Sequence, residues 1–368
     1  MSIPLTLIVK TSSTCNMACR YCDADIYSKE SMSFETLACM VKSALDTGRN
    51  VEFIWHGGEP LLLGKDFYQK VTWLQQKCLQ NGQHISNCIQ TNGTLLTDEW
   101  LDFFCFHGFE IGLSIDGPAI LQDKNRVMQN QKGSFGLVLD ALSLLRSRKM
   151  HFGVLAVVTE DTIRFGAKKF FNFFVENGLK NFDILCRRPA IITGAEDYTS
   201  RSNHSQFVKE IFDLWYYLDD PEIHIREFES IMSALLGGEH SSCILAGGCF
   251  GKYFAVDPNG EVYHCDEFMN DPKYRLGNLV RENFKDIISG PQIENLMEEN
   301  KRQIQNLDCK WFPMCNGGCP KDRYLARIFA EERRIQCCGF ADLIEHIQGR
   351  LIENPDVARL ETLRQLSS

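Results

Sequence analysis

The chain of 368 residues has no apolar run long enough to cross a membrane, because no window reaches the roughly 18 apolar residues that a spanning helix needs. Its first segment, MSIPLTLIVKTSS, has too short an apolar stretch for a secretory signal peptide and no small-residue cleavage site. An excess of positive charge is also missing, since the formal net charge is −9. These absences predict a cytoplasmic protein that binds neither a membrane nor a nucleic acid.

Internal repeats and low-complexity linkers are absent as well. The content of 44% hydrophobic and 24% charged residues is typical of a globular protein, and the length allows one large domain and a smaller one. Sixteen cysteines in a cytosolic chain of this size favour metal sites and isolated thiols over disulfides. The isolated cysteines, predicted to be small buried apolar side chains, are Cys39, Cys78, Cys88, Cys105 and Cys186.

Short apolar runs alternate with amphipathic stretches of helical length from residue 4 to about 186. The predicted strands cover 5–9, 51–55, 85–90, 110–115, 151–158 and 182–185. The predicted helices between them cover 34–48, 64–80, 96–107, 134–148 and 162–177. This order predicts a parallel βα array, either an open doubly wound sheet or a partial TIM-type barrel. Further helices are predicted over 205–218 and in the tail from 339, and a domain boundary near 236–242.

The most informative motif is the C-x3-C-x2-C loop formed by Cys15, Cys19 and Cys22. A structural zinc site or an ordinary ferredoxin cluster takes four protein ligands, whereas three thiolates on a four-iron cluster leave one iron open to a small molecule. A zinc knuckle or chance spacing is the alternative. With Tyr21 in the loop and an apolar strand before it, the motif resembles the signature of the radical S-adenosylmethionine (radical SAM) superfamily.

In that family SAM binds the open iron and is cleaved to a 5′-deoxyadenosyl radical. The resemblance implies a partial (β/α)6 barrel of TIM type, with the cluster loop after the first strand. It also implies SAM contacts at the ends of the predicted strands: Gly57, Gly58 and Glu59 near the methionyl amino group, and Arg126 on the carboxylate. A simple turn before a helix is the alternative for the GGEP segment. The remaining SAM contacts implied are Tyr21, Asn92, Ser114 and Leu185, and a barrel-core role is an alternative for Leu185.

The last third of the chain holds a second group of cysteines. Cys249 is followed by Gly260 and Cys265, with Gly260 predicted as the turn of a hairpin. A C-x5-C-x3-C segment and a late cysteine pair come next: Cys309, Cys315, Cys319, Cys337 and Cys338. The pattern resembles the SPASM domain, which holds two auxiliary four-iron clusters, and a zinc ribbon is the alternative.

By this resemblance the first auxiliary cluster is ligated by Cys243, Cys249, Cys265 and Cys319, and the second by Cys309, Cys315 and Cys337. One cysteine of the pattern is missing, because Asn306 stands in its place. The second cluster therefore has an open iron, takes a substitute ligand such as Asp308 or Cys338, or does not assemble. The predicted cofactors are SAM and three [4Fe-4S] clusters. The predicted domains are the radical SAM barrel over 1–238, the SPASM domain over 239–338 and a helical tail over 339–368.

Asp266, directly after Cys265, resembles the aspartate that takes a proton from the substrate in the anaerobic sulfatase-maturating enzymes; a turn cap is the alternative. Trp55 and His56 stand where those enzymes have a glutamine before GGEP, and this segment is more similar to radical SAM maturases that cross-link ribosomal peptides into cyclophanes. His56 is predicted as a substrate contact or proton relay, or as a plain strand-end histidine. The chain is thus predicted to be a radical SAM oxidoreductase that oxidises a peptide or protein side chain by two electrons, as in cross-link formation, with a flavodoxin or ferredoxin as reductant.

Three alternatives accompany this prediction. Sulfatase maturation, the oxidation of Cys or Ser to formylglycine, is favoured by Asp266 and disfavoured by His56. Dehydrogenation or epimerisation of a small sugar-like molecule is an alternative because no peptide-binding extension precedes the first strand. A non-catalytic iron–sulfur electron carrier is disfavoured, because a carrier needs no SAM site.

Overall fold

The computed structural model describes residues 4–22, 29–188, 199, 201–305, 307–328 and 339–354. The chain forms two compact units, each assembled from separate segments. The first unit contains Met1–Ser114, Asp123–Phe152 and Gly248–Glu299, and the second contains Ile115–Gln122, Gly153–Gly247 and Asn300–Ser368. No helix in the described ranges has the length and apolar character needed to span a membrane.

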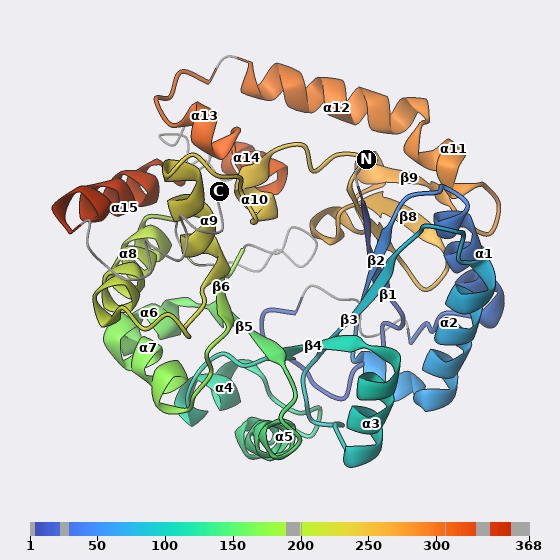
Figure 1. Ribbon diagram of the computed structural model, residues 1–368, viewed down its shortest axis with the longest axis horizontal. Helices are drawn as coiled ribbons and strands as arrows, with labels where there is room; N and C mark the ends of the chain where they lie inside the picture. Colours follow the sequence, from blue (N-terminus) through green and yellow to red (C-terminus); the bar gives the residue numbers. More distant parts are fainter. Residues whose placement is uncertain are drawn as a thin grey trace. The chain divides into compact units, whose positions relative to one another are not determined.

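The first unit is built on a mixed sheet with the strand order β4-β3-β2-β1-β7-β8-β9 (Figure 1). Strands β1 to β4 are parallel, β7 is parallel to β1, and β8 and β9 continue the sheet in antiparallel pairing. The strands are β1 Leu5–Lys10, β2 Val51–His56, β3 Ile85–Thr91, β4 Phe109–Ser114, β7 Tyr253–Val256, β8 Glu261–His264 and β9 Arg275–Asn278. The pairing of β1 with β7 brings the segment that contains Cys249 and Cys265 into the same sheet as the first parallel strand.

The parallel strands of the first unit are connected by helices with clear sequence causes. In α1 (Phe34–Leu45), Ser33 caps the first turn by accepting a hydrogen bond from the Thr36 backbone N–H. Leu37 and Val41 follow at helical spacing and are fully buried, each contributing about 1.5–3 kcal/mol through burial. The other helices of this unit are α2 Lys65–Cys78, α3 Asp98–His107, α5 Phe135–Ser147 and α11 Phe284–Ile288, with short 3₁₀ turns at Pro60–Leu63, Asp266–Phe268 and Pro272–Tyr274. Two helices have residues in both units, α4 Ala119–Asn125 and α12 Pro291–Ile304.

The second unit contains the parallel pair β5 (Phe152–Val158), except for its first residue, and β6 (Phe182–Cys186), together with a set of helices. Its core is aromatic: the ring centroids of Phe174 and Phe182 lie 4.5 Å apart in a stacked arrangement, and both side chains are fully buried. The helices are α6 Glu160–Phe165, α7 Ala167–Glu176, α8 Arg201–Leu218, α9 Arg226–Leu235, α10 Cys243–Ala246, α13 Phe312–Cys315, α14 Pro320–Ile328 and α15 Ala341–Glu353.

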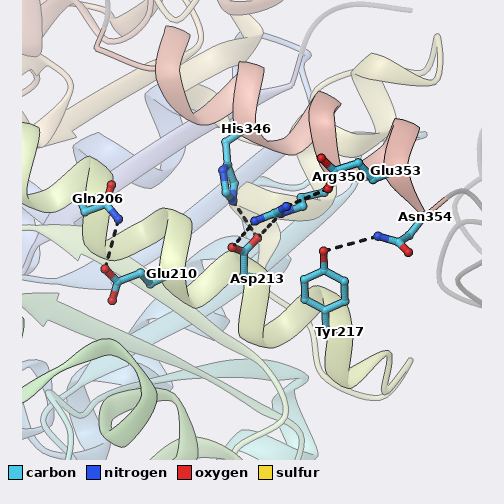
Figure 2. Close-up of polar contacts among 8 residues, drawn as sticks. All are labelled: Gln206, Glu210, Asp213, Tyr217, His346, Arg350, Glu353 and Asn354. Atoms are coloured by element: carbon cyan, nitrogen blue, oxygen red, sulfur yellow. Dashed lines mark hydrogen bonds and ion pairs between the residues drawn. The ribbon is translucent and has the colours of Figure 1, made fainter.

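The C-terminal helix α15 packs on α8 within this unit (Figure 2). Asp213 of α8 accepts hydrogen bonds from Arg350 Nε at 2.9 Å and from His346 Nε2 at 2.7 Å. Burial raises the pKa of the Asp213 carboxyl, but these two donors outweigh it and hold the pKa below its usual range. The apolar side of α15 is buried as well, through Leu343, Ile344 and Ile347. The helix is therefore an integral part of the second unit.

The structure confirms the six predicted strands and the predicted helices, with one difference in the helix at 162–177. Gly166 has φ +99°, which interrupts the helical path and divides this stretch into α6 and α7. The hairpin turn at Gly260 is confirmed, with φ +84° between β7 and β8. The prediction that the isolated cysteines are buried is wrong for Cys105, which is exposed on α3, and the other four are only half-buried. The last predicted stretch of the tail, 355–368, lies outside the described residues, and the predicted domain boundary stays a prediction.

Candidate active site

The cluster loop follows β1 in the first unit. Cys15 and Cys19 are half-buried and Cys22 is exposed. The Cys22 backbone N–H donates to the Cys19 carbonyl at 3.1 Å, which closes a turn between them, and the Met17 N–H donates to Cys15 Sγ at 3.4 Å. Burial raises the pKa of the Cys15 thiol to about 11, so a metal that binds the thiolate must displace a proton there.

A second segment of the same unit holds this loop in place. The Arg20 backbone N–H donates to the Asn125 carbonyl at 2.9 Å, and the Arg126 guanidinium lies over the Tyr21 ring at 5.3 Å from its centroid. The loop and Arg126 are therefore neighbours, as the SAM-site prediction requires. Asn125 is a residue that the sequence interpretation missed: its Nδ2 is buried and has no hydrogen-bond partner among the described residues.

The two glycines after β2 allow a close approach of backbone to backbone. A Cβ at Gly58 would lie 2.1 Å from the Thr14 carbonyl oxygen, and one at Gly57 would lie 2.7 Å from Lys10 Cα. Both residues also have positive φ, +82° for Gly57 and +51° for Gly58. Only glycine fits at Gly58, because any Cβ would overlap the segment that leads into the cluster loop.

Glu59 is nearly fully buried and accepts three hydrogen bonds. Its Oε1 accepts from Thr91 Oγ1 at 2.7 Å and from the Leu61 N–H at 3.1 Å, and its Oε2 accepts from the Asn92 N–H at 2.8 Å. Burial raises the pKa of this carboxyl to about 7, although the three donors lower it. The Asn92 side chain donates in turn to Asn16 Oδ1 in the cluster loop at 2.9 Å. The end of β3 is thus tied both to GGEP and to the cluster loop.

Ser114 at the end of β4 accepts a hydrogen bond from Gln90 Nε2 at 3.1 Å. Gly112 makes room for Gln90, since a Cβ there would lie 2.1 Å from its Oε1. Leu185, the last predicted SAM contact, belongs to β6 of the second unit and is 37% exposed, which is unusual for a barrel-core side chain.

Asp266 forms an ion pair with a residue that the sequence interpretation did not single out. Lys10 Nζ lies 3.4 Å from Asp266 Oδ2, and Lys10 is opposite His56 in the β1–β2 register. Burial would raise the pKa of Asp266, but the Lys10 ammonium, together with the hydrogen bond from the Cys265 thiol, outweighs it and holds the pKa below its usual range. Lys10 could have been recognised as a candidate site residue from the sequence, because it is a charged residue at the carboxyl end of a predicted parallel strand.

The His56 ring is neutral in this setting. Desolvation and the charge of Lys10 lower its pKa to about 3. Its Nδ1 accepts a hydrogen bond from the Gly57 N–H at 2.6 Å, which leaves the ring proton on Nε2. The three side chains Lys10, His56 and Asp266 therefore form a small polar group at the ends of β1 and β2.

Two cysteines of the second group belong to the first unit. Cys249 precedes β7, and Cys265 follows β8 with φ +61°. The Cys265 thiol donates to Asp266 Oδ1 at 3.4 Å, so the predicted base is in contact with a predicted ligand. His264 Nε2 lies 3.7 Å from Cys249 Sγ. Burial lowers the pKa of His264 to about 4, opposed only by the Tyr253 carbonyl.

The other described cysteines of this group belong to the second unit. Cys243 begins α10, which packs on α13 through a hydrogen bond from Asn316 Nδ2 to the Leu245 carbonyl at 2.9 Å. Cys315 ends α13 and is buried. Cys309 and Cys319, on either side of α13, are half-buried. Three predicted positions, Cys337, Cys338 and Asn306, lie outside the described residues, and Asp308 is described and exposed.

The residues that are present fit iron–sulfur clusters and SAM. The donor sets are thiols, which are the ligands of such clusters. Asn125 Nδ2 beside the first loop and Trp311 Nε1 between Cys309 and Cys315 are buried donors without a protein acceptor in the described ranges, as expected where an acceptor comes from a bound group. Within those ranges no three His, Cys, Asp or Glu side chains converge closely enough to hold a single metal ion. When bound, a reduced cluster and SAM supply an organic radical.

Comparisons with known proteins agree with this assignment. A profile of the radical SAM superfamily matches residues 9–164, and a profile of the SPASM iron–sulfur cluster-binding domain matches residues 249–320. A cysteine-type anaerobic sulfatase-maturating enzyme from Clostridium perfringens is 32% identical over 95% of this chain and 98% of the relative. A serine-type enzyme of the same kind from Bacteroides thetaiotaomicron is 32% identical over 94% of this chain and 89% of the relative.

Solved structures give the same result. The structure of native anSMEcpe with bound AdoMet and Cp18Cys peptide superposes with a TM-score of 0.81 at 31% identity, covering 95% of this chain and 98% of that chain. SuiB from Streptococcus suis bound to its precursor peptide SuiA has a TM-score of 0.62 at 16% identity, covering 87% of this chain and 73% of that chain, and shares the fold.

The fold, the first cysteine loop and the second group of cysteines define a radical SAM enzyme with a SPASM domain. The chain belongs to the radical SAM family that includes the anaerobic sulfatase-maturating enzymes. The predicted enzyme class, the α/β partial-barrel fold and the cofactors, SAM and [4Fe-4S] clusters, are confirmed by these matches. The assignment of individual ligands and SAM contacts stays a prediction, now with the geometry described above.

Proposed function

We propose that this enzyme oxidises a Cys or Ser side chain of a sulfatase-type peptide or protein to formylglycine. The observation that carries the proposal is the similarity along nearly the whole chain to both cysteine-type and serine-type sulfatase-maturating enzymes. This replaces peptide cross-linking, the main expectation from the sequence, with its stated alternative. Cross-linking rested on Trp55 and His56, two residues of one motif, whereas the similarity covers both domains.

The proposed reaction removes two electrons from the substrate. One hydrogen atom would leave the β-carbon of the target side chain to the radical that the bound cofactors would supply. A proton and one electron then leave, and for cysteine the product reacts with water to give the aldehyde and sulfide. Asp266 would take the proton; the ion pair with Lys10, which lowers the pKa of its carboxyl, supports this role.

The other residues orient and shield the reaction. Glu59 and the backbone at Gly57 and Gly58 would hold the amino group of SAM, and Arg126 its carboxylate, with bidentate geometry. His56 would contact the substrate through its Nε2–H, because its Nδ1 is already bonded to Gly57. The auxiliary clusters would accept the second electron, and a flavodoxin or ferredoxin would reduce the first cluster.

The role of Asp266 is tested by Asp266→Asn in the reconstituted full-length enzyme. We expect SAM cleavage to continue, measured as 5′-deoxyadenosine, while substrate oxidation falls by about 100-fold or more, as when a general base is removed. Asp271→Asn is the matched control: Asp271 lies in the same segment and caps a short 3₁₀ turn, through a hydrogen bond from Lys273 N–H at 3.0 Å. Unchanged product formation in Asp266→Asn would remove it as the base.

The substrate class is tested with two peptides and mass spectrometry. A sulfatase-derived peptide with the target Cys or Ser should yield a hydrazine-reactive aldehyde. A ribosomal precursor peptide with aromatic core residues should remain unchanged. A cross-linked product from the second peptide, with no aldehyde from the first, would contradict the proposal and support cyclophane formation. Turnover of only a small sugar-like molecule would contradict both peptide reactions.

A further inference from the structure

His264 is a buried imidazole to which the SPASM resemblance assigns no role. It is the last residue of β8, directly before Cys265, and is 1% exposed. Its ring stacks on Phe250, with centroids 3.8 Å apart and planes 16° apart, and lies 5.9 Å from the Phe268 ring at 28°. These aromatic contacts and the burial of the ring exclude water and restrict the orientation of the imidazole.

One ring nitrogen is directed at a sulfur atom. His264 Nε2 lies 3.7 Å from Cys249 Sγ. A ligating thiolate sulfur only accepts hydrogen bonds, so this contact is favourable when Nε2 carries the ring proton. A proton on Nε2 points toward Cys249, whose sulfur is anionic when it ligates a cluster.

We propose that His264 is a positioning residue for the auxiliary cluster bound through Cys249, and that its Nε2–H donates a hydrogen bond to the Cys249 sulfur and raises the reduction potential of that cluster. The inference rests on the proposed function in taking Cys249 as a ligand. A hydrogen bond to a ligand sulfur stabilises negative charge on the cluster, and the reduced state carries one more negative charge than the oxidised state. The bond therefore favours the reduced state.

This places a redox control beside the predicted base. Cys265 and Asp266 follow His264 without a gap, so the residue that takes the substrate proton and the residue that tunes the electron acceptor belong to one short segment. A higher potential makes the auxiliary cluster a better acceptor for the electron that leaves the substrate. His264 would thus direct the second oxidation step without touching the substrate.

The test is a potentiometric titration of the full-length reconstituted enzyme, followed by electron spin resonance and carried out without any peptide. His264→Phe removes the N–H but keeps a planar ring that can contact Phe250 and Phe268. We expect the auxiliary cluster to shift to a lower midpoint potential while the potential of the SAM-binding cluster and the rate of SAM cleavage stay unchanged. His264→Gln, which restores an N–H donor, should recover part of the shift. Phe250→Leu changes the stacking alone and should leave the potential near that of the parent enzyme.

An unchanged auxiliary potential in His264→Phe with full iron content would overturn the inference, as would an equal shift in Phe250→Leu. If His264→Phe does not assemble the cluster, the parent enzyme labelled with ¹⁵N-histidine decides. Pulsed spin resonance should then show a weak nitrogen coupling and an exchangeable proton on the auxiliary cluster, and their absence would overturn the inference.

Cys249→Ala separates this inference from the function on which it rests. It should abolish the auxiliary signal and keep the SAM-binding cluster. A retained auxiliary signal would overturn the ligation by Cys249 and the role of His264 with it. A confirmed potential shift in an enzyme that oxidises no sulfatase peptide would overturn the proposed substrate and leave the role of His264 intact.

Discussion

Two acidic side chains of the first unit, Glu59 and Asp266, are held in very different ways. Glu59 is 1% exposed and accepts three hydrogen bonds, two of them from backbone N–H groups. Asp266 has a side chain that is 29% exposed and is held by the ion pair with Lys10 at 3.4 Å and by the thiol of its neighbour Cys265. The proposed cofactor side of the site is therefore more tightly held by hydrogen bonds than the proposed substrate side, which has more room to adjust when a substrate binds.

The largest effect is expected from a substitution that displaces the backbone beside Glu59. Gly58→Ala would place a Cβ 2.1 Å from the Thr14 carbonyl oxygen. Displacing this segment should lower SAM cleavage by about 100-fold, equivalent to about 3 kcal/mol of lost positioning. Gly48→Ala is the control, because Gly48 also has positive φ, +73°, but has no atom within 4 Å of the added Cβ. Similar losses of 5′-deoxyadenosine release in the two variants would contradict the packing argument.

The next largest effect is expected from a substitution that removes the negative charge of Glu59 but keeps the shape of its side chain. Glu59→Gln should weaken SAM binding by about tenfold to 100-fold, because hydrogen bonds to a charged group are worth about 1.5–3 kcal/mol. Burial holds the pKa of Glu59 at about 7, so the carboxylate is lost as pH falls through that value. SAM affinity of the parent enzyme should therefore decline below neutral pH, while that of the variant should not. Calorimetric titration at several pH values measures both, with the exposed Glu35→Gln as control.

A smaller effect is expected at Asp266 when its ion-pair partner Lys10 is removed. Lys10→Met removes the cation that keeps Asp266 ionised, at a site where both side chains are partly exposed. Substrate oxidation should fall by about tenfold, or about 1.4 kcal/mol, while SAM cleavage continues. The readout is the ratio of 5′-deoxyadenosine to oxidised product, which should rise. Lys42→Met removes an exposed lysine that pairs only with Asp46 and should leave this ratio unchanged.

The smallest effect is expected for an ion pair of the second unit, away from Glu59 and Asp266, and serves as a reference for the other three. Asp213→Asn removes the partner of Arg350 and His346 at a 28% exposed site, and should cost about 1 kcal/mol of local stability. The stabilisation of the folded state by ionised Asp213 is fully present above about pH 3.9, the carboxyl pKa in the unfolded chain. It is lost as the pH falls through the pKa of Asp213 in the folded state, which is lower. Faster hydrogen exchange of the α15 amides at neutral pH measures it. Gln206→Ala, which loses only a bond to Glu210 (Figure 2), should exchange like the parent.

Much of the fold could be predicted because it depends on local patterns. The six strands and their helices follow from apolar periodicity, and caps such as Ser33 and turn glycines such as Gly260 depend on neighbours in the chain. The division at Gly166 was missed because a single glycine inside an amphipathic run is compatible with a continuous helix. Burial of Cys105 was wrongly predicted because a cysteine carries no mark of the helix face on which it lies.

The site was predicted where a motif carries its own spacing and missed where a contact crosses the chain. GGEP and the cysteine loop could be identified in isolation. Asn125 and Lys10 became visible only when the loop packed against 125–128 and when β1 paired with β2. Lys10 and Asp266 are 256 positions apart, and no local rule connects them.

The amino-acid sequence by itself determined the class of chemistry, because thiolate number and spacing decide which metal group can bind and whether a coordination position stays open. Only the tertiary structure decided how charges are shared among Lys10, His56 and Asp266 and which sulfur His264 faces. Ion pairs, pKa values and hydrogen bonds to sulfur depend on distances of a few ångströms and on the exclusion of water. Both quantities are created when strands far apart in the chain form one sheet.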